Sequence, residues 1–288
     1  MRSWLALAGL GIAVAGLGAW VYFKPAPVEV STHALSTLKP PEITHLRVER
    51  IDAGQPDVVT TIVLEREPAG WRITAPFAAR ADAGQIERLL AILEARSVAR
   101  YPTTDLARYG LARPHGRLTA NDQVFAYGAM NAMTREQYVL AGAAVHAVPI
   151  ARASALPRDA EALLARTLFA PGESPVRFEL PQFVMALEDG TWKLTPAATE
   201  TSADERIAWV DGWRNASAIR ARRHEGGAVP ARISVTLKDG RVLALGLLQR
   251  EPELALLRAD EGIRYYFVAE IAKRLLLPPG GTPKPETK

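Results

Sequence analysis

The chain has 288 residues, of which 48% are hydrophobic and 23% charged, with a formal net charge of +4. These values argue against a disordered chain and give no reason to expect nucleic acid as a partner. The sequence contains no cysteine, which excludes disulfides and thiolate metal sites.

The first feature is an uncharged apolar stretch, Trp4–Phe23. An α-helix of about 20 residues covers the ~30 Å hydrocarbon core of a bilayer. We therefore expect a single-pass anchor in a bacterial inner membrane. A cleaved signal peptide is the alternative, but its apolar core would be shorter and followed by a small-residue cleavage site. Arg2 and Lys24 nearly balance across the stretch, and a very short N-terminal tail usually stays inside, so the remaining chain is predicted to be periplasmic.

The predicted fold class is α+β: an N-terminal transmembrane helix followed by two tandem repeated α+β units with mainly antiparallel sheets. Alternating apolar positions predict strands, and the 3.6-residue period predicts helices. The predicted divisions are an anchor at 1–23, a Pro-rich linker at 24–42, a first unit at 43–157, a bridging helix and linker at 158–174, a second unit at 175–278 and a disordered tail at 279–288.

The first unit is predicted to hold one helix among strands. Asp82 is the expected N-cap, with Gln85 in capping-box position and an apolar face running from Ile86 to Leu93. Arg96 and Arg100 are placed near the helix end. The predicted strands are Ile43–Ile51, Val58–Glu67, Trp71–Thr74, Arg117–Ala120, Gln123–Tyr127, Gln137–Leu140 and Val145–Ile150.

After a bridging helix at Asp159–Leu168, the second unit is predicted to repeat this plan. Ser202 and Glu205 form a capping box before a helix whose apolar face holds Ile207, Val210 and Trp213. A last helix is expected at Ala269–Leu277. The predicted strands are Phe183–Leu187, Thr191–Leu194, Ile233–Leu237, Val242–Leu247, Leu254–Leu257 and Tyr265–Val268.

Two matches at one offset indicate a duplication. Trp71-Arg-Ile-Thr corresponds to Trp192-Lys-Leu-Thr, an offset of 121 residues from 71 to 192. The same offset carries Ile150–Pro157 onto Ile271–Pro278. Because the two matches lie far apart in the sequence, we predict a duplicated unit of about 120 residues.

The first unit also resembles a known family. Trp71 on its strand, the helix start at Ala81-Asp82, Tyr109-Gly-Leu-x-x-Pro114, Tyr127-Gly128 and Tyr138-Val139 are similar to the bacterial DUF4340 family. The resemblance covers residues 43–170 and, more loosely, 175–278. It implies a membrane-anchored domain of unknown function, in some members an accessory component of ABC-type transporters, with no catalytic residues to carry over.

The residues themselves point to no chemistry. The five histidines are scattered without metal-ligand spacing, and neither a P-loop nor a nucleophile elbow is present. No catalytic, cofactor-binding or metal residue is therefore expected. Candidate partner contacts are Tyr109 and Arg113 in one loop, and Arg220, Arg222 and Arg223 in the only concentrated basic run, for which a solvated loop is the alternative.

These observations predict a non-catalytic periplasmic accessory or scaffolding protein of an envelope complex, for example one containing an ABC transporter. Its expected partners are the membrane, through residues 4–23, and another envelope protein. The alternative is a periplasmic module that binds a lipid, glycan or peptide in the cleft between the two units. An envelope hydrolase is a third hypothesis, which would need a polar cluster assembled only by the fold.

Overall fold

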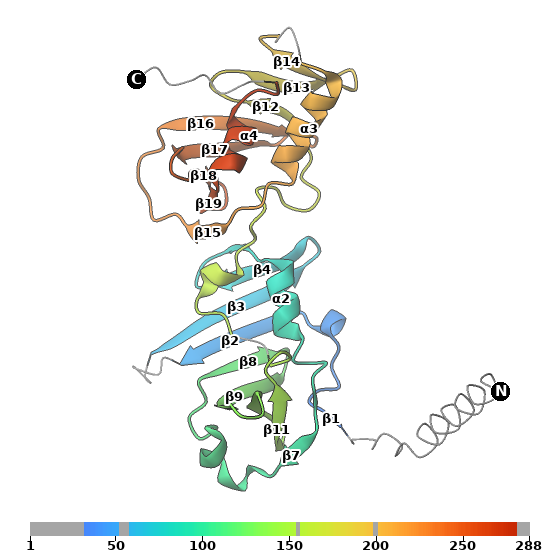
Figure 1. Cartoon of the computed structure of the whole chain (residues 1–288), viewed down its shortest axis with the longest axis vertical. Helices are drawn as coiled ribbons and strands as arrows, with labels where there is room; N and C mark the ends of the chain where they lie inside the picture. The colour runs from blue at the N-terminus through green and yellow to red at the C-terminus, as the bar shows by residue number, and fades with distance from the viewer. Residues whose placement is uncertain (1–31, 52–57, 154–155, 198–200, 281–288) are drawn as a thin grey trace, which may run out of the picture.

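The computed structural model describes residues 32–51, 58–153, 156–197 and 201–280. Two large antiparallel sheets with few helices follow one another along the long axis of the molecule (Figure 1), and a small two-stranded sheet accompanies the first. This agrees with the predicted sheet-rich α+β class. Within these ranges no helix is long and apolar enough to cross a membrane. The predicted anchor, Trp4–Phe23, lies outside the described residues.

The first sheet has nine strands in the order β5-β4-β3-β2-β8-β9-β10-β11-β7. It combines two meanders, β2 to β4 and β8 to β11, placed side by side through antiparallel pairing of β2 with β8. The strands are β2 (His45–Ile51), β3 (Val59–Glu67), β4 (Gly70–Ala75), β5 (Ala79–Arg80), β7 (Ala99–Tyr101), β8 (Gly116–Ala120), β9 (Gln123–Asn131), β10 (Glu136–Ala141) and β11 (Ala144–Pro149).

The second sheet has eight strands in the order β14-β13-β12-β16-β17-β18-β19-β15. Apart from β5, the two sheets follow the same path: a three-stranded meander, a helix, a strand at the far edge, and a four-stranded meander. The strands are β12 (Pro175–Glu179), β13 (Val184–Glu188), β14 (Thr191–Thr195), β15 (Arg220–Arg223), β16 (Ala231–Leu237), β17 (Val242–Gln249), β18 (Leu254–Arg258) and β19 (Ile263–Phe267).

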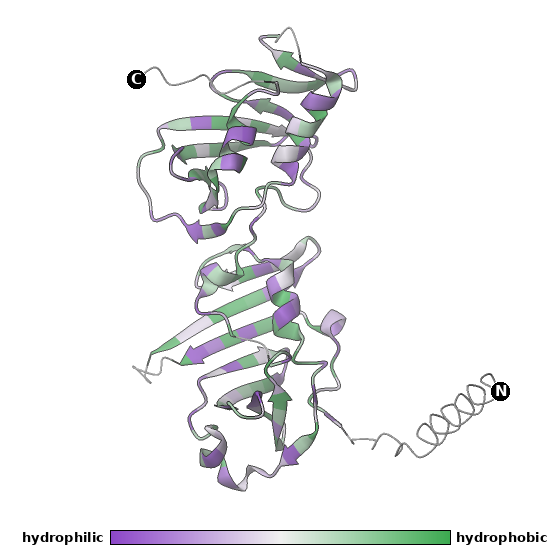
Figure 2. Cartoon of the chain, viewed as in Figure 1, coloured by the Kyte–Doolittle hydropathy of each residue, from purple (hydrophilic) through white to green (hydrophobic). Residues whose placement is uncertain are grey.

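Each sheet buries one face under a helix. Helix α2 (Ala83–Leu90) packs against β4, while α3 (Ala203–Arg214) packs against β14 and α4 (Ala269–Leu276). The strands and helices carry both hydrophobic and hydrophilic bands (Figure 2), as expected where one face is covered and the other meets water. The matched residues Trp71 and Trp192 are both buried, and so is Trp213 of α3, whose Nε1 donates to the Leu275 carbonyl at 3.0 Å.

The predicted helix starts are confirmed, but the helix faces and ends differ in part. Asp82 accepts a hydrogen bond from the Gln85 N–H, and Ser202 and Glu205 form the capping box. Helix α2 stops at Leu90, so Arg96 and Arg100 do not lie at its end. They lie on β6 (Arg96–Ser97) and β7, because the chain there pairs with β1 (His33–Ala34) and β11. On α3, Ile207 was predicted to lie on the buried face but is 48% exposed. Trp209 is buried in the core instead.

The predicted linker at 24–42 needs correction. Strand β1 pairs with β6 in a separate two-stranded sheet, Leu35 is only 5% exposed, and its carbonyl accepts from Gln123 of β9. Residues 33–35 are therefore attached to the first unit, and the segment ends in the 3-10 turn Pro40–Glu42. Burial of the Leu35 side chain therefore favours an ordered segment here, although the prolines indicated a linker. At the other end of the chain, Pro279 is buried within the tail predicted to be disordered. Residues 24–31 and 281–288 lie outside the described ranges.

The predicted bridging helix at Asp159–Leu168 is only a 3-10 turn, Ala160–Leu163. Asp159 caps it as a helix start would, through the Ala162 N–H. Leu164 is extended, however, and forms a bridge with Ala81. Pairing with the end of the first sheet thus replaces further helical hydrogen bonds.

Candidate functional site at the junction of the two sheets

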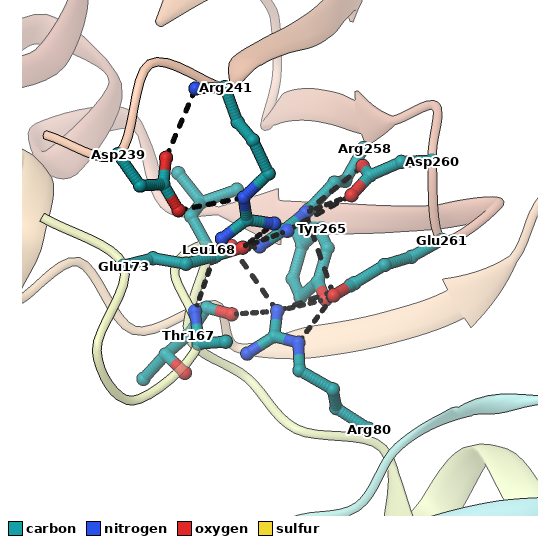
Figure 3. Close-up of polar contacts among 11 residues, drawn as sticks. Arg80, Thr167, Leu168, Glu173, Asp239, Arg241, Arg258, Asp260, Glu261 and Tyr265 are labelled. Carbon is teal, nitrogen blue, oxygen red and sulfur yellow. Dashed lines mark hydrogen bonds and ion pairs between the residues drawn. The ribbon is translucent and has the colours of Figure 1, made fainter. Parts of the chain in front are cut away.

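The two sheets meet at a network of charged side chains that begins with Arg80. This residue lies on the short edge strand β5, where Ala79 is buried and Arg80 pairs in register with Arg72 of β4. Its guanidinium leaves the first sheet and reaches the second (Figure 3). Nε and Nη2 donate to both carboxylate oxygens of Glu261, and Nη2 also donates to the Tyr265 hydroxyl at 3.0 Å. One arginine therefore links the first sheet to the β18–β19 hairpin of the second.

The segment between the sheets is held by the same arginine. Its Nη2 donates to the carbonyls of Thr167 and Leu168, at 2.8 and 3.2 Å. The backbone carbonyl of Arg80 accepts from the Ala165 N–H, and Thr167 forms a bridge with Ser217 beside the second sheet. The connecting chain is thus paired on both sides.

A second arginine, Arg258 of β18, forms the most buried part of the network. Its guanidinium donates to both oxygens of Glu173 at 2.7 Å, to the Leu168 carbonyl at 2.6 Å and to Asp260. The side chains of Arg258 and Glu173 are 3% and 6% exposed. This two-pronged geometry is the strongest form of arginine–carboxylate pairing. Arg241, itself paired with Asp239, approaches Glu173 to 3.4 Å.

The pKa shifts follow from this pairing. Burial alone would raise the pKa of Glu173, but hydrogen bonds from Arg258 and the Ala170 N–H hold it below its ordinary value. Burial opposes the charged form of Arg258 as well, yet its carboxylate partners raise its pKa. For Tyr265, burial is the main reason that the pKa lies above its ordinary value. Pairing thus favours the charged forms of Glu173 and Arg258, and burial favours the neutral phenol of Tyr265.

This arrangement fixes the orientation of the two sheets relative to each other. The arginines and carboxylates of the network are directed at one another and at backbone carbonyls. The network therefore connects the two sheets rigidly. Buried ion pairs are weak evidence for added stability, because desolvation offsets the attraction, but removal of one partner leaves a costly unpaired charge. A single hydrophobic cluster containing residues of both sheets adds apolar packing.

The predicted basic run lies close to this junction on β15. Arg222 forms an ion pair with Glu161 at 2.7 Å, and the Arg223 N–H donates to the same carboxylate. The Arg223 guanidinium also lies 5.4 Å from the centre of the Phe77 ring. Arg220 instead pairs with Glu253. Each of the three thus has a partner within the chain, and contact with another protein remains a prediction.

The other predicted contact residues lie elsewhere. Tyr109 closes the 3-10 turn Ala107–Tyr109 and is buried, with its ring 5.3 Å from Tyr101 and 4.9 Å from Tyr138. Arg113 is exposed in the following loop, before β8. The structure therefore does not bring these two residues together with the run on β15.

The junction residues were not predicted from the sequence. A signal existed in Arg258, a charged residue directly after the apolar run Leu254–Leu257. Its partner Glu173 is 85 residues away in the sequence, and Arg80 and Glu261 are separated by 181 residues, so no local pattern could pair them. In the described part of the chain, no group of three or more His, Asp or Glu side chains could hold a metal ion.

Comparison with known families supports the resemblance seen in the sequence. The family described as "Domain of unknown function (DUF4340)" matches residues 71–220, more than half of the chain. The chain belongs to the DUF4340 family. The DUF4340 match starts on β4 and ends at the first residue of β15, so it covers parts of both sheets and includes Arg80 and Glu173. No curated protein and no solved structure matches the chain.

Proposed function

We propose that this protein is a non-catalytic accessory or scaffolding component of an envelope complex, held at the inner membrane by residues 4–23. The remaining chain would lie in the periplasm as two tandem α+β units, at residues 43–157 and 175–278. The shared strand order of the two sheets and the sequence matches at an offset of 121 residues support a duplication. Association with an ABC-type transporter is part of the same proposal.

The junction carries this proposal. A scaffold must hold its partners at a fixed distance and angle, and therefore needs a rigid connection between its binding surfaces. The pairs Arg80–Glu261 and Arg258–Glu173, together with the paired connecting segment, supply such a connection. The alternative, a lipid, glycan or peptide held between the units, is less favoured because these buried side chains occupy the junction.

The test compares the full-length protein with an Arg80→Met variant and the matched surface variant Arg47→Met. Each is cross-linked in native membranes and recovered with its neighbours. We expect the wild type and Arg47→Met to recover the same envelope proteins, and Arg80→Met to lose those that need both units. Substrate turnover that a single polar substitution abolishes would contradict the proposal, as would identical recovery by all three proteins.

Membrane attachment has a separate test. A periplasm-active reporter enzyme fused after Lys288 should be active, and deletion of residues 4–23 should release the protein from the membrane fraction. An inactive reporter would contradict the predicted orientation, and retention of the deleted form would contradict the predicted anchor.

A further inference from the structure

A small pocket of about 220 Å³ lies on the second sheet, between the segment 224–230, which joins β15 to β16, and strands β17, β18 and β19. Its polar lining consists of His224, Gln249, Arg264 and Tyr266. The lining residues and their neighbours in the sequence all belong to the described ranges. We call this space the outer pocket, because it lies on the face of the sheet that α3 and α4 do not cover.

Strand alternation places Arg264 on this outer face. Its neighbours Ile263 and Tyr265 are each 1% exposed and belong to the hydrophobic cluster that includes residues of α3 and α4. Arg264 therefore points the other way, where it lies opposite Leu257 of β18 and Arg222 of β15. Strand β18 is buried along its whole length, on both faces, so the outer face is covered in part. A charged side chain thus lies at a covered face with another arginine beside it.

Local structure brings the segment 224–230 onto the sheet and shapes the pocket beneath it. A Cβ on Gly246 of β17 would lie 2.7 Å from Val229 Cγ1, so the missing side chain lets the segment approach. Gly226 turns the segment with a φ of 98°, which other residues rarely adopt. The register between β17 and β18 shifts just before Gln249, and such bulges often redirect side chains beside functional sites.

Arg264 is left without a partner. Within the described residues its guanidinium takes part in no ion pair, and its buried Nε has no hydrogen-bond partner. His224 Nδ1, in the same lining, is also buried and has no hydrogen-bond partner. Unpaired buried polar groups cost free energy, and charged groups cost more. Arg222, directly opposite Arg264, adds the repulsion of like charges.

The neighbouring arginines of this face are already neutralised. Arg220 forms an ion pair with Glu253, and Arg222 forms one with Glu161. Among the described residues, Arg264 is the arginine of this face that lacks a carboxylate. The outer pocket therefore offers one unpaired guanidinium, whose planar fork matches the two oxygens of a single carboxylate.

We propose that the outer pocket receives the carboxylate of an aspartate or glutamate side chain in an acidic segment of a partner protein. Arg264 would donate two parallel hydrogen bonds to the carboxylate, and His224 would donate a further one through Nδ1. One carboxylate balances the charge of one guanidinium, whereas a phosphate dianion would exceed it. The inference names one partner contact of the proposed scaffold, and so it rests on that proposed function.

The size of the pocket favours a side chain over a free small molecule. Small-molecule sites typically measure roughly 300–1,000 Å³, which is more than the outer pocket provides. A single acidic side chain needs less space, and the rest of its segment would lie outside the pocket. The exposed residues Arg222, Glu225 and Gly227 surround the entrance on β15 and the following segment.

Fluorescence anisotropy tests the proposal with the full-length protein in a maltoside detergent. The probe is a rhodamine-labelled peptide with one glutamate among glycines and serines, and its analogue carries glutamine instead. Unlabelled peptide and inorganic phosphate serve as competitors. The pocket variant is Arg264→Gln, and the control Arg274→Gln removes an exposed arginine from α4. If Arg264→Gln does not fold, Arg264→Lys replaces it, because lysine keeps the charge but cannot donate the paired hydrogen bonds.

We expect saturable binding of the glutamate peptide that weakens at least about tenfold in Arg264→Gln and stays unchanged in Arg274→Gln, because charge-assisted hydrogen bonds are lost. The glutamine peptide should not bind. Thermal melting should show Arg264→Gln at or above the wild-type midpoint, since the side chain has no partner to lose and its repulsion with Arg222 disappears.

Three results would overturn the proposal: no saturable binding of the glutamate peptide by the wild type, equal binding of the glutamine peptide, or tighter binding of phosphate than of the glutamate peptide. A peptide-binding loss that accompanies a lowered melting midpoint in Arg264→Gln would assign the residue a structural role and contradict it as well. None of these results changes the recovery of envelope proteins by Arg80→Met, so failure of this site is distinguishable from failure of the scaffolding role.

Discussion

Replacing Arg80 with methionine tests whether the ion pairs fix the junction. Methionine keeps an apolar stem but removes the hydrogen bonds to Glu261, Tyr265 and two carbonyls. The side chains of Arg80 and Glu261 are 15% and 13% exposed. Loss of one partner from a fully buried pair costs about 3–5 kcal/mol. Glu261 would keep the Tyr265 hydroxyl at 2.7 Å and Arg258 at 3.5 Å, so we expect a loss of about 2–3 kcal/mol.

Urea unfolding of the full-length protein measures this loss. The control is Arg47→Met, because Arg47 pairs with Glu49 at 2.8 Å but is 55% exposed. Exposed pairs contribute about 0–1 kcal/mol, so the control should unfold near the wild-type midpoint. The comparison separates loss of the junction from loss of an arginine in general.

The relative orientation of the two sheets can be measured independently of stability. Because the chain lacks cysteine, introduced cysteines can be spin-labelled at chosen positions. Spin labels at Val124→Cys on β9 and Val242→Cys on β17 occupy positions that are 45% and 59% exposed. We expect a narrow distance distribution between them in the wild type and a broader one with Arg80→Met. If the Arg80 variant matches the Arg47 control in both stability and label distances, the ion pairs do not set the orientation of the sheets.

Three further predictions concern single sites. Because burial tends to raise the pKa of Glu173 but pairing with Arg258 holds it below the ordinary 4.5, its contribution is present above about pH 4.5 and is lost as pH falls through the lowered value. Glu173→Gln should therefore destabilise the protein at pH 7 and flatten the acid limb of its stability–pH curve; an unchanged limb would contradict this. Gly128→Ala should destabilise the protein by about 1–3 kcal/mol, because the added Cβ would overpack its surroundings. Gly212→Ala in α3, which has open space around it, should stabilise the protein by up to about 1 kcal/mol. Urea midpoints measure both effects, and a reversed order would refute the packing argument. Asp82→Ala should cost about 1 kcal/mol, because it removes the side-chain acceptor of the Gln85 N–H at the start of α2, and an unchanged urea midpoint would contradict this.

Much of the fold could be predicted because its signals are local. Period-two alternation located the long strands, and the caps at Asp82 and Ser202 placed both helix starts. The Asp189-Gly190 hairpin forms with positive φ at both residues, as its sequence indicates. The tyrosine and glycine motifs are also local, and they indicate the DUF4340 family that matches residues 71–220.

The errors occurred where distant segments compete with local preference. The helix predicted over Asp159–Leu168 is shortened because Leu164 pairs with Ala81, which is 83 residues earlier in the chain. Arg96 lies on β6 and not at the end of α2, because β6 pairs with β1. Local periodicity carries no information about such pairings.

The sequence by itself determined most of the long strands, the helix starts, the family and the repeated tryptophan strand, because each depends on residues within a few positions of one another. The strands β12 and β15 were not predicted, because their place in the sheet depends on pairing with β13, β16 and β19. Only the tertiary structure decided which charges are neutralised. It places Arg80 beside Glu261 and Arg258 beside Glu173. An arginine looks the same in the sequence whether it joins two sheets or faces solvent, since the difference lies in what folding brings within hydrogen-bonding distance.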